Sequence, residues 1–437
     1  MKRVAVVGSG ISGLAVAHGL EAEAQVTLFE AGDYFGGHTH TVDVTLQGVT
    51  HGVDTGFLVF NERTYPHLIQ LFADLGVETA ASDMSFSVQV PGLSGSNSLE
   101  WSGNNLNTVF AQRSNLLRPA FWRMLKDIVR FNRLATDIAQ AGREAELAEP
   151  IGDFLQRNRF SPSFRDWYFL PMIGCIWSCP TDQMLQFPIA TMIRFCHNHG
   201  LIQVANRPQW HTVRGGAKHY VQRLLQGITD ARLRTPVLGV KRLGSGQVAV
   251  ATGAGTELFD DVVLACHSEQ SLALLDNASA QERHVLGAIR YHPNRAVLHT
   301  DTAVLPQRRL AWAAWNYARA AELGREQSAV CLHYLINKLQ PLPWQQAVLV
   351  SLNPDPARMP DPRQVIGSYD YSHPVFDRAA VAAQQQLPLI QGNAGVWFCG
   401  AWTRYGFHED GLMSAQAVLQ SLRDAWRGSL QTRLEAA

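Results

Sequence analysis

Three glycines near the N-terminus have the spacing of a phosphate-binding turn. Gly8, Gly10 and Gly13 form the pattern Gly-x-Gly-x-x-Gly between an apolar run at 4–7 and a helical pattern at 11–20. The first glycine allows a tight turn, the second lets the backbone approach a pyrophosphate, and the third lets helix and strand pack closely. The free N–H groups that begin the helix would add a partial positive charge for the phosphates.

Glu30 adds an acid where such a site needs one. It follows the apolar run 25–29, twenty residues after Gly10. A carboxylate there can bind both ribose hydroxyls and would repel a 2′-phosphate. The strand, the helix and the acid together disfavour an ordinary glycine-rich turn, but these residues alone allow NAD or FAD equally.

The elements that must position this motif form one βαβ unit. The pattern predicts a strand at 4–7, a helix at 11–20 and a strand at 25–29. Alternation around Gln47-Gly48 predicts a hairpin of 41–46 and 49–53. Further predicted elements are a helix at 64–75, a mostly helical region at 105–200, strands at 237–243, 247–252, 261–265 and 396–399, and a helix from Gly411 onward.

The strands that could join the N-terminal sheet come in three separated blocks. We therefore predict an α/β fold with a discontinuous nucleotide-binding domain, whose blocks are residues 1–80, 205–288 and 376–437. The two intervening segments, 81–204 and 289–375, are predicted to form a second domain.

Composition restricts the class of protein. Lys+Arg and Asp+Glu both number 37, which argues against a nucleic-acid binder because such proteins need a basic excess. No CxxC pair is present, so no metal site is indicated. No uninterrupted apolar stretch of about 18 residues is present and the glycines interrupt any signal-peptide pattern, so we expect a cytoplasmic protein.

The segment 36–41, GGHTHT, carries a family resemblance. It resembles the flavin amine oxidase and phytoene desaturase superfamily, in which a paired glycine after the ribose acid is followed by Arg and, three residues on, by Thr or Ser. Here His38 replaces the Arg and Thr41 stands at the expected position. The resemblance implies non-covalent FAD, held by a Rossmann-like domain of the glutathione-reductase type with an inserted α+β substrate domain.

Four further segments resemble the same superfamily in chain order: 53–57, 214–217, 235–237, and 398–402 with 409–414. The resemblance assigns FAD binding to Gly8, Gly10, Ile11, Ser12, Gly13, Glu30, Ala31, Gly36, Gly37, His38, Thr39, Gly56, Val237, Gly400, Ala401, Gly411, Leu412 and Met413. A helix that begins near Gly411 would point its N-terminus at the N1–C2=O edge of the flavin and stabilise the anionic reduced state. Asp410 is then the expected N-cap of that helix.

A narrower resemblance rests on GGHTHTVDV, VDTGFLVFNERTYP, the PQW to GG segment (208–216), AWAAWNY (311–317) and GFHEDG (406–411). These motifs are similar to those of a bacterial flavoprotein subfamily, which resembles the flavoprotein region fused to cyclopropane fatty-acid synthases in plants. The resemblance suggests redox chemistry on or beside modified acyl chains, and a methyltransferase as a possible partner.

The candidate catalytic residues follow from a difference between this sequence and the superfamily pattern. Amine oxidases of the superfamily place a Lys near flavin N5, but the strand 294–299, in the equivalent region, has none. Asn294 or Arg295 could take that place, and His408 is a third candidate. Because the flavin carries the chemistry, no catalytic triad is expected. The candidate substrate pocket, with core packing as the alternative, consists of Trp312, Trp315, Tyr317 and Phe407.

A basic amphipathic stretch, 113–133, offers a second kind of contact. Arg118, Arg123, Lys126, Arg130 and Arg133 alternate there with apolar residues. Such a face can rest on an anionic membrane, and the alternative is a helix with a solvated basic side.

Three hypotheses follow. The first is an FAD-dependent oxidoreductase that takes a hydride from a largely apolar substrate, with an acyl-lipid desaturase-type reaction as its specific form. The second is a flavin amine oxidase that produces an imine and hydrogen peroxide. The third is a redox-silent flavoprotein partner of a lipid methyltransferase.

Overall fold

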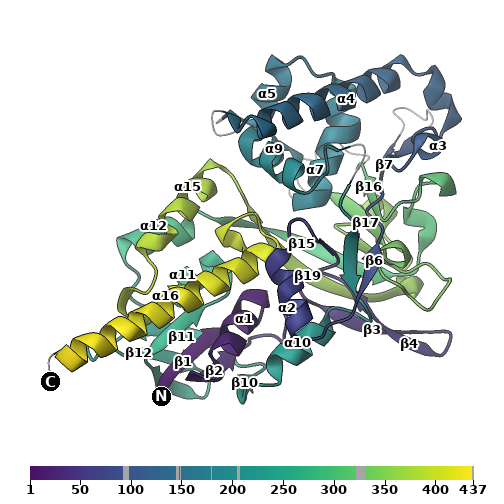
Figure 1. The fold of residues 1–437 in the computed structure, drawn as a ribbon. Coiled ribbons are helices and arrows are strands. Elements are labelled where there is room, and N and C mark those ends of the chain that lie inside the picture. Colours follow the sequence, from purple (N-terminus) through teal and green to yellow (C-terminus); the bar gives the residue numbers. More distant parts are fainter. Residues whose placement is uncertain are drawn as a thin grey trace.

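The computed structural model describes residues 1–91, 98–143, 147, 149–178, 180–203, 207–320 and 330–435. Figure 1 shows a sheet-and-helix body that holds both termini, a second sheet beside it, and a helical lobe at the top. Among the described helices, none combines the length and apolar composition needed to cross a bilayer.

A five-stranded parallel sheet forms the centre of the first body. Its strands, in order, are β10 (Asp230–Arg232), β2 (Ala24–Phe29), β1 (Lys2–Val7), β14 (Asp261–Leu264) and β20 (Val396–Phe398). Alternate residues of β1 pack into different cores, Val4 and Val6 on one face and Ala5 and Val7 on the other. Burial on both faces explains the uninterrupted apolar run at 4–7 in the central strand β1.

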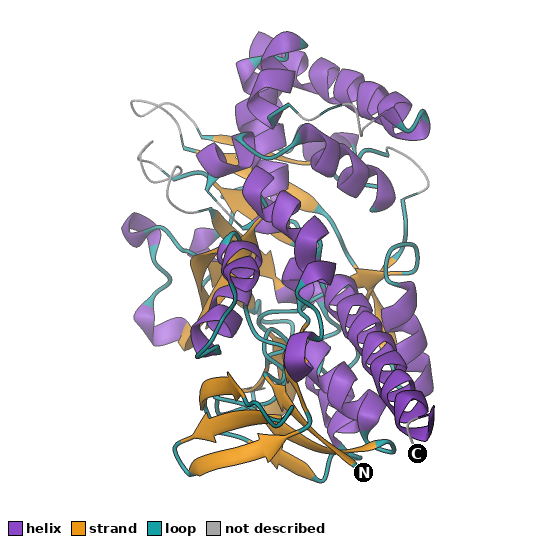
Figure 2. Ribbon diagram, turned by 90° about the vertical axis from the view of Figure 1, so that its left-hand side faces the viewer, coloured by secondary structure: helices purple, strands orange, loops and turns teal. Residues whose placement is uncertain are grey.

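Helices cover one face of this sheet. α1 (Ile11–Leu20) lies alongside α16 (His408–Glu435), as Figure 1 shows. Their approach is so close that a Cβ on Gly19 would lie 2.6 Å from Leu419 Cδ1. The other face packs against the antiparallel strands β11 (Val237–Arg242), β12 (Val248–Thr252) and β13 (Gly255–Phe259), which appear beside the N-terminus in Figure 2. α11 (Ser268–Leu274), α12 (Ala280–Gly287) and α15 (Arg378–Gln386) complete this body.

A seven-stranded sheet forms the second body. Its order is β19 (Val365–Val375), β15 (Arg290–His299), β18 (Leu349–Leu352), β17 (Cys331–Leu335), β16 (Trp315–Ala318), β7 (Phe86–Val90) and β8 (Leu99–Ser102). Only β16 and β7 pair in parallel among these strands. All seven come from the two segments between the nucleotide-binding blocks, although the exact domain boundaries stay a prediction.

The helical lobe stands on this sheet. It contains α3 (Leu106–Val109), α4 (Pro119–Gln140), α5 (Ile151–Arg157), α6 (Pro162–Phe164), α7 (Leu170–Trp177), α8 (Thr181–Leu185) and α9 (Ile189–Asn198). Phe121 and Phe131 of α4 are fully buried and fix its inner face. The mostly helical character predicted for 105–200 is confirmed.

Shorter elements connect the bodies: β3 (Thr41–Leu46), β4 (Val49–Asp54), β5 (Phe60–Asn61), α2 (Pro66–Asp74), β6 (Thr79–Ser82), β9 (Trp210–Val213), α10 (Lys218–Leu225) and α14 (Ile336–Leu339). β3 and β4 form the predicted hairpin, with Leu46 opposite Val49. α2 begins two residues later than predicted because the Asn61 side chain accepts the N–H groups of Arg63 and Thr64 and holds them in a turn.

Candidate functional site

A cavity of about 770 Å³ opens at the carboxyl ends of four parallel strands. Gly8 follows β1, Glu30 follows β2, Ala265 follows β14 and Gly400 lies just beyond β20, and all four line the cavity. Ligands of open parallel sheets bind at this edge. We call this part of the cavity the groove.

The N-terminal glycines shape the groove by their missing side chains. Gly8 has a φ of +101°, and a Cβ there would lie 3.0 Å from the Ala265 carbonyl oxygen. A Cβ on Gly13 would lie 1.9 Å from the Gly8 carbonyl oxygen, so Gly13 holds α1 against β1 without lining the cavity. Gly10 has no neighbour within 4 Å of its Cβ position and caps α1 without a side-chain bond. The N–H groups of the first turn of α1 therefore remain available to a ligand. Ile11 and Ser12, the first two residues of this turn, also line the cavity.

Glu30 is fixed where the sequence places it. Its carboxylate accepts hydrogen bonds from the Ser9 N–H at 3.0 Å, the Gly32 N–H at 2.8 Å and the Ser9 hydroxyl. Ala31 and Val237 line the cavity beside it. An acid held by backbone donors next to open space is suited to receive ribose hydroxyls.

The paired glycines pack directly on the first motif. Gly36 and Gly37 have φ values of +128° and +58°, and a Cβ on Gly37 would lie 3.1 Å from Gly10 Cα. Gly56 packs on His38, the residue after Gly37, since a Cβ on Gly56 would lie 2.2 Å from the His38 carbonyl oxygen. Gly36, Gly37, His38 and Gly56 all line the cavity.

His38 faces the cavity at the position that the family pattern gives to Arg. Its Nε2 is buried with no hydrogen-bond partner among the described residues. Burial lowers the pKa of His38 to about 4, so the ring is neutral. Thr39 points elsewhere, because its hydroxyl bonds Tyr220 and, at 2.9 Å, His408 Nε2.

The C-terminal motif reaches the cavity one helical turn earlier than predicted. Gly400, Ala401, Phe407 and His408 line it, and α16 begins at His408. Gly411 instead packs on α1, where the Ser12 hydroxyl donates to its carbonyl oxygen at 2.9 Å. Neither Gly411 nor the two residues after it, Leu412 and Met413, line the cavity.

The prediction that Asp410 is the N-cap is wrong. It is the third residue of α16, and its carboxylate reaches back to accept the Phe407 N–H at 3.0 Å. This is the acidic half of a capping box, so the local signal for a helix start is real but shifted by three residues. Burial raises the pKa of Asp410 to about 7.

Only one of the three candidate catalytic residues lines the cavity. His408 does, with its ring stacked on Phe57 at 3.8 Å and its Nε2 3.1 Å from the Tyr220 hydroxyl. Asn294 is buried behind the cavity wall, and Arg295 is exposed and pairs with Asp370 at 3.0 Å. Alternation along β15 places these two side chains on opposite faces of the sheet.

The aromatic candidates divide evenly. Trp315 and Phe407 line the cavity. Trp312 donates to the Pro306 carbonyl oxygen at 2.7 Å and packs in a separate small cluster, while Tyr317 is buried at 2% exposure. Those two follow the core-packing alternative.

Beyond the groove, the cavity continues into an apolar space that we call the chamber. Its walls come from β7, β16, β17, β18, α7 and α9, together with the segments around 57–65 and 402–408. Its large side chains are Tyr65, Met84, Phe86, Met172, Cys175, Ile176, Trp177, Phe195, His199, Leu201, Trp210, Trp315, Tyr334, Leu352, Phe376, Tyr405 and Phe407. Burial lowers the pKa of His199 to about 4, so this ring is neutral. Among the described residues that line the whole cavity, Glu30 is the only Asp, Glu, Lys or Arg.

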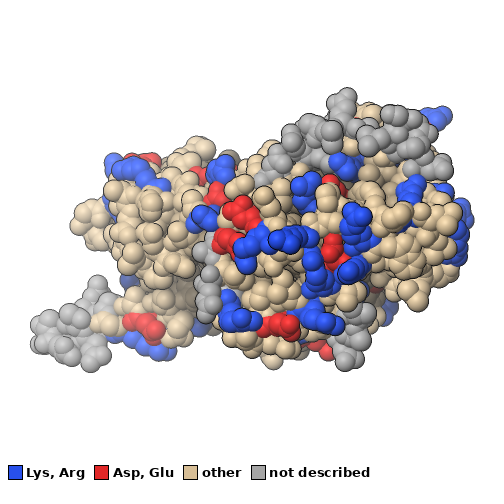
Figure 3. Space-filling view, turned by 90° about the horizontal axis from the view of Figure 1, so that it is seen from above, with Lys and Arg blue, Asp and Glu red and all other residues tan. Residues whose placement is uncertain are grey.

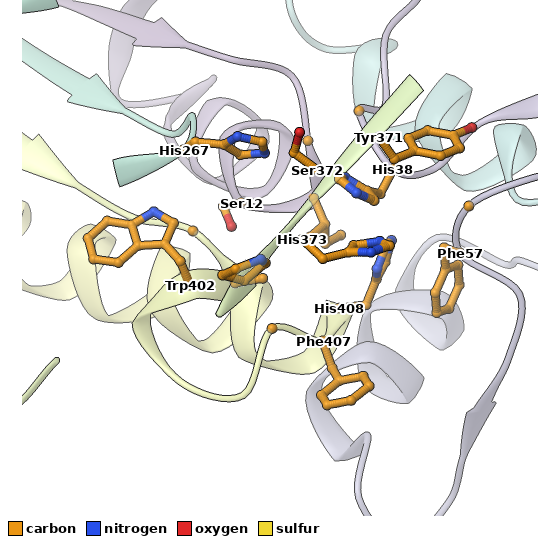
Figure 4. A pocket seen from close by; sticks show the side chains of 18 of the residues that line it. Ser12, His38, Phe57, His267, Tyr371, Ser372, His373, Trp402, Phe407 and His408 are labelled. Carbon is orange, nitrogen blue, oxygen red and sulfur yellow. The ribbon is translucent and has the colours of Figure 1, made fainter. Parts of the chain in front are cut away.

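Most of the chamber was missed from the sequence, as were His267 and Tyr371. The sequence favours a turn at His373-Pro374, with a pocket role as the alternative; the structure places both residues on β19, where they line the cavity. Figure 4 shows His38, His373 and His408 converging from three different elements. The rings of His38 and His373 are 5.3 Å apart, and Tyr371 lies 5.2 Å from His38. No contiguous motif encodes this convergence, although the run Tyr-Asp-Tyr-Ser-His at 369–373 on one strand is a local sign of a polar wall.

Comparison with known proteins places these features. Residues 11–305 match the family model described as flavin containing amine oxidoreductase. A segment is 41% identical over 83 residues to a 1-hydroxycarotenoid 3,4-desaturase of Flavobacterium sp. (strain P99-3), and this match spans 18% of the chain and 16% of that desaturase.

Solved structures share the fold over nearly the whole chain. A fatty acid isomerase from P. acnes that produces CLA aligns with a TM-score of 0.66 and 14% identity, covering 96% of this chain and 98% of the other. Cyclohexylamine oxidase from Brevibacterium oxydans IH-35A aligns with a TM-score of 0.65 and 17% identity, covering 97% and 99%. The predicted Rossmann-like, amine-oxidase-like fold is confirmed.

Proposed function

The chain belongs to the flavin containing amine oxidoreductases, and on that premise we propose that it oxidises a largely apolar substrate with non-covalently bound FAD. The observation that carries this proposal is the chamber, whose described lining is mostly aromatic and aliphatic, with the neutral ring of His199 and no Asp, Glu, Lys or Arg. A charged substrate would lose its hydration there without gaining a counter-ion. An apolar chain gains free energy from the same transfer.

The groove fits FAD on its own geometry. The open face of Gly10 and the uncapped start of α1 suit a pyrophosphate, and Glu30 suits a ribose. The unpartnered Nε2 of His38 is a further group that a bound ligand would satisfy. Once bound, the flavin supplies hydride acceptance, and the protein contributes binding, orientation and exclusion of water.

Non-covalent binding is supported by the thiol nearest the groove. Cys266 lines the cavity, and burial raises the pKa of its thiol to about 11. A thiol that stays protonated is a poor nucleophile towards a flavin ring. Cys399 is fully buried and does not line the cavity.

The substrate class that we favour is an acyl chain, in a desaturase-type reaction linked to cyclopropane or methylated fatty-acid metabolism. The names of a fatty acid isomerase and a carotenoid desaturase among the similar proteins support apolar substrates for this fold. In such a reaction Trp315 and Phe407 would pack on the chain, and the chamber would keep water from the reacting carbon.

Two alternatives have specific support. Cyclohexylamine oxidase shares the fold, and the aromatic rings of Phe407 and Trp315 could cage a neutral amine. The third hypothesis is a redox-silent partner of a lipid methyltransferase. It is supported by the described cavity lining, which contains no Lys and neither of the two residues, Asn294 and Arg295, that could replace it.

Anaerobic mixing of the FAD-loaded protein with candidate substrates tests the proposal. We expect loss of the oxidised-flavin absorbance with phospholipid or fatty acid and none with cyclohexylamine or polyamines. Bleaching by amines alone would contradict the lipid proposal. If neither bleaches the flavin and a purified lipid methyltransferase binds the protein stably, the third hypothesis replaces it.

We also propose that the outer face of the helical lobe contacts anionic membranes. Leu117 is 86% exposed and Trp122 is 49% exposed, beside the start of α4. The exposed basic residues of the same stretch, 113–133, are Arg113, Arg123, Lys126, Arg130 and Arg133, of which Arg130 pairs with Asp127. In Figure 3, which views the molecule from above, Lys and Arg predominate over Asp and Glu. Exposed apolar side chains and exposed cations along one stretch of chain fit the headgroup region of an anionic bilayer.

A further inference from the structure

His373 occupies the boundary between the groove and the chamber. It lies near the end of β19, opposite His292 of β15, and lines the cavity. Figure 4 shows its ring between those of His38 and His408, with Phe407 close by. Asn294 lies behind it, outside the cavity.

A chain of hydrogen bonds fixes which nitrogen of His373 carries the proton. The backbone N–H of Arg295 donates to Asn353 Oδ1 at 2.9 Å, so Asn353 must present its Nδ2 to Asn294. Asn353 Nδ2 then donates to Asn294 Oδ1 at 2.7 Å. Asn294 Nδ2 in turn donates to the His292 carbonyl oxygen at 3.1 Å and to His373 Nδ1 at 3.0 Å.

Backbone groups anchor both ends of this relay, so neither amide can be reversed without losing a bond. The N–H of Arg295 can only donate, and the carbonyl oxygen of His292 can only accept. Nδ1 of His373 is therefore an acceptor, and a neutral ring carries its proton on Nε2. Burial, with His38, His267 and His292 nearby, lowers the pKa of His373 to about 3, so the ring stays neutral.

The other two histidines at this boundary do not offer the same group. Nε2 of His408 is already within 2.9 Å of the Thr39 hydroxyl and 3.1 Å of the Tyr220 hydroxyl. Nε2 of His38 has no partner among the described residues, and the neighbours of its ring are the rings of Tyr371 and His373 rather than an amide that would set its tautomer. His373 is thus held as a neutral N–H donor at the cavity surface.

We propose that His373 donates its Nε2–H to the flavin and stabilises the reduced state, with Asn294 and Asn353 as positioning residues. This proposal rests on FAD as the cofactor, but not on the identity of the substrate. A bound flavin that accepted a hydride would become negatively charged, and a fixed N–H donor would stabilise that charge. The described lining offers no Lys or Arg for that charge, so a fixed N–H is well matched to it.

The decisive variant replaces the hydrogen-bond donor to His373 Nδ1 by an acceptor. In Asn294→Asp, a carboxylate replaces the donating amide, so His373 should carry its proton on Nδ1 and turn a lone pair towards the cavity. Nitrogen-15 NMR of the histidine rings reads this change directly, in the protein with or without flavin. We expect the Nε2–H tautomer in the original protein and the Nδ1–H tautomer in Asn294→Asp.

The flavin midpoint potential, measured by reductive titration with a reference dye, tests the purpose of the donor without any substrate. His373→Phe should weaken binding of reduced relative to oxidised flavin about tenfold, which is about 30 mV for a two-electron couple. His373→Gln, which keeps an amide N–H near the same place, should restore most of that loss. Asn294→Asp is left out of the comparison of midpoint potentials, because its added negative charge would itself change the potential.

Several results would overturn the proposal. An Nδ1–H signal in the original protein contradicts the relay, and an unchanged potential in flavin-loaded His373→Phe contradicts the donor. If His373→Phe retains no flavin, an unchanged potential in Asn294→Leu, which frees the ring, also contradicts it. Failure of every lipid substrate would count against the proposed function alone, since neither measurement uses a substrate.

Discussion

The groove and the chamber are built by different means, although they belong to one cavity. The groove consists of backbone: Gly8, Gly10 and Gly37 pack on neighbouring backbone or face open space because they lack side chains. The chamber consists of side chains from α7, α9 and four strands that are distant along the chain. The proposed cofactor site is therefore specified by short contiguous segments, and the proposed substrate space by the packing of elements that are distant along the chain.

The two regions also differ in polarity. The groove offers free N–H groups and the ordered carboxylate of Glu30, while the chamber offers rings and aliphatic groups. His38, His373 and His408 lie between them and are all kept neutral by burial, which lowers the pKa of each ring. This boundary is where a flavin ring would meet an apolar substrate.

The largest effect should come from filling the groove. Gly10 has a φ of −63° and no neighbour within 4 Å of its Cβ position, so Gly10→Leu can fold but would occupy the space for the pyrophosphate. We expect FAD affinity to fall by at least about 100-fold, which corresponds to about 2.7 kcal/mol. Flavin absorbance after gel filtration and calorimetric titration measure it.

Gly244→Leu is the matched control, since Gly244 also has no neighbour within 4 Å and lies in an exposed turn away from the cavity. Both variants should unfold at the temperature of the original apoprotein. A Gly10→Leu protein that stays yellow would refute the placement of the cofactor.

The contrast between regions explains what the sequence could predict. The helix at 11–20 has the bounds of α1, and the residues of 36–38 line the cavity, because local backbone geometry determines both. Asn294 and Arg295 were placed on the correct strand, but pairing with β18 and β19 decides which face meets the cavity. Trp312 and Trp315 differ for the same reason, since only tertiary packing separates a pocket ring from a core ring.

A charge in the chamber should have the next largest effect. Ile176 of α7 lines the chamber, and Ile176→Asp should raise the KM for an apolar substrate at least about tenfold, since one buried side chain contributes about 1.5–3 kcal/mol. Steady-state kinetics with the lipid that bleaches the flavin measures it. FAD affinity should not change, because the groove is untouched.

Ile176→Leu controls for shape, and Ile176→Asn separates polarity from charge. If the chamber instead receives amines, Ile176→Asp would lower the KM for a cationic amine. That result would show that the chamber receives cationic amines and would contradict an apolar substrate.

The outer face of the lobe should show a smaller effect. Leu117→Asp should reduce binding to vesicles that contain anionic lipid about tenfold, because it removes one inserted apolar side chain and adds repulsion. Co-sedimentation with vesicles of phosphatidylcholine and phosphatidylglycerol measures it. Leu389→Asp is the control, because Leu389 is also an exposed leucine, at 59%, but lies outside the helical lobe. Equal loss in both variants, or no binding by the original protein, would contradict the membrane surface.

The last prediction concerns the pH dependence of stability rather than binding, and it rests on the buried acid beside the boundary. The pKa of Asp410 is raised from 3.8 to about 7 by burial, so folding favours its protonated form. The stability that this preference contributes is complete below about pH 3.8 and is lost as the pH rises towards 7, at about 1.4 kcal/mol for each pH unit in that interval. Asp410→Asn keeps an oxygen for the Phe407 N–H and cannot ionise, so its melting temperature should decline less than that of the original protein between pH 4 and 7. Melting curves across that range test it, and parallel declines in the two proteins would show that Asp410 ionises as easily as an exposed acid.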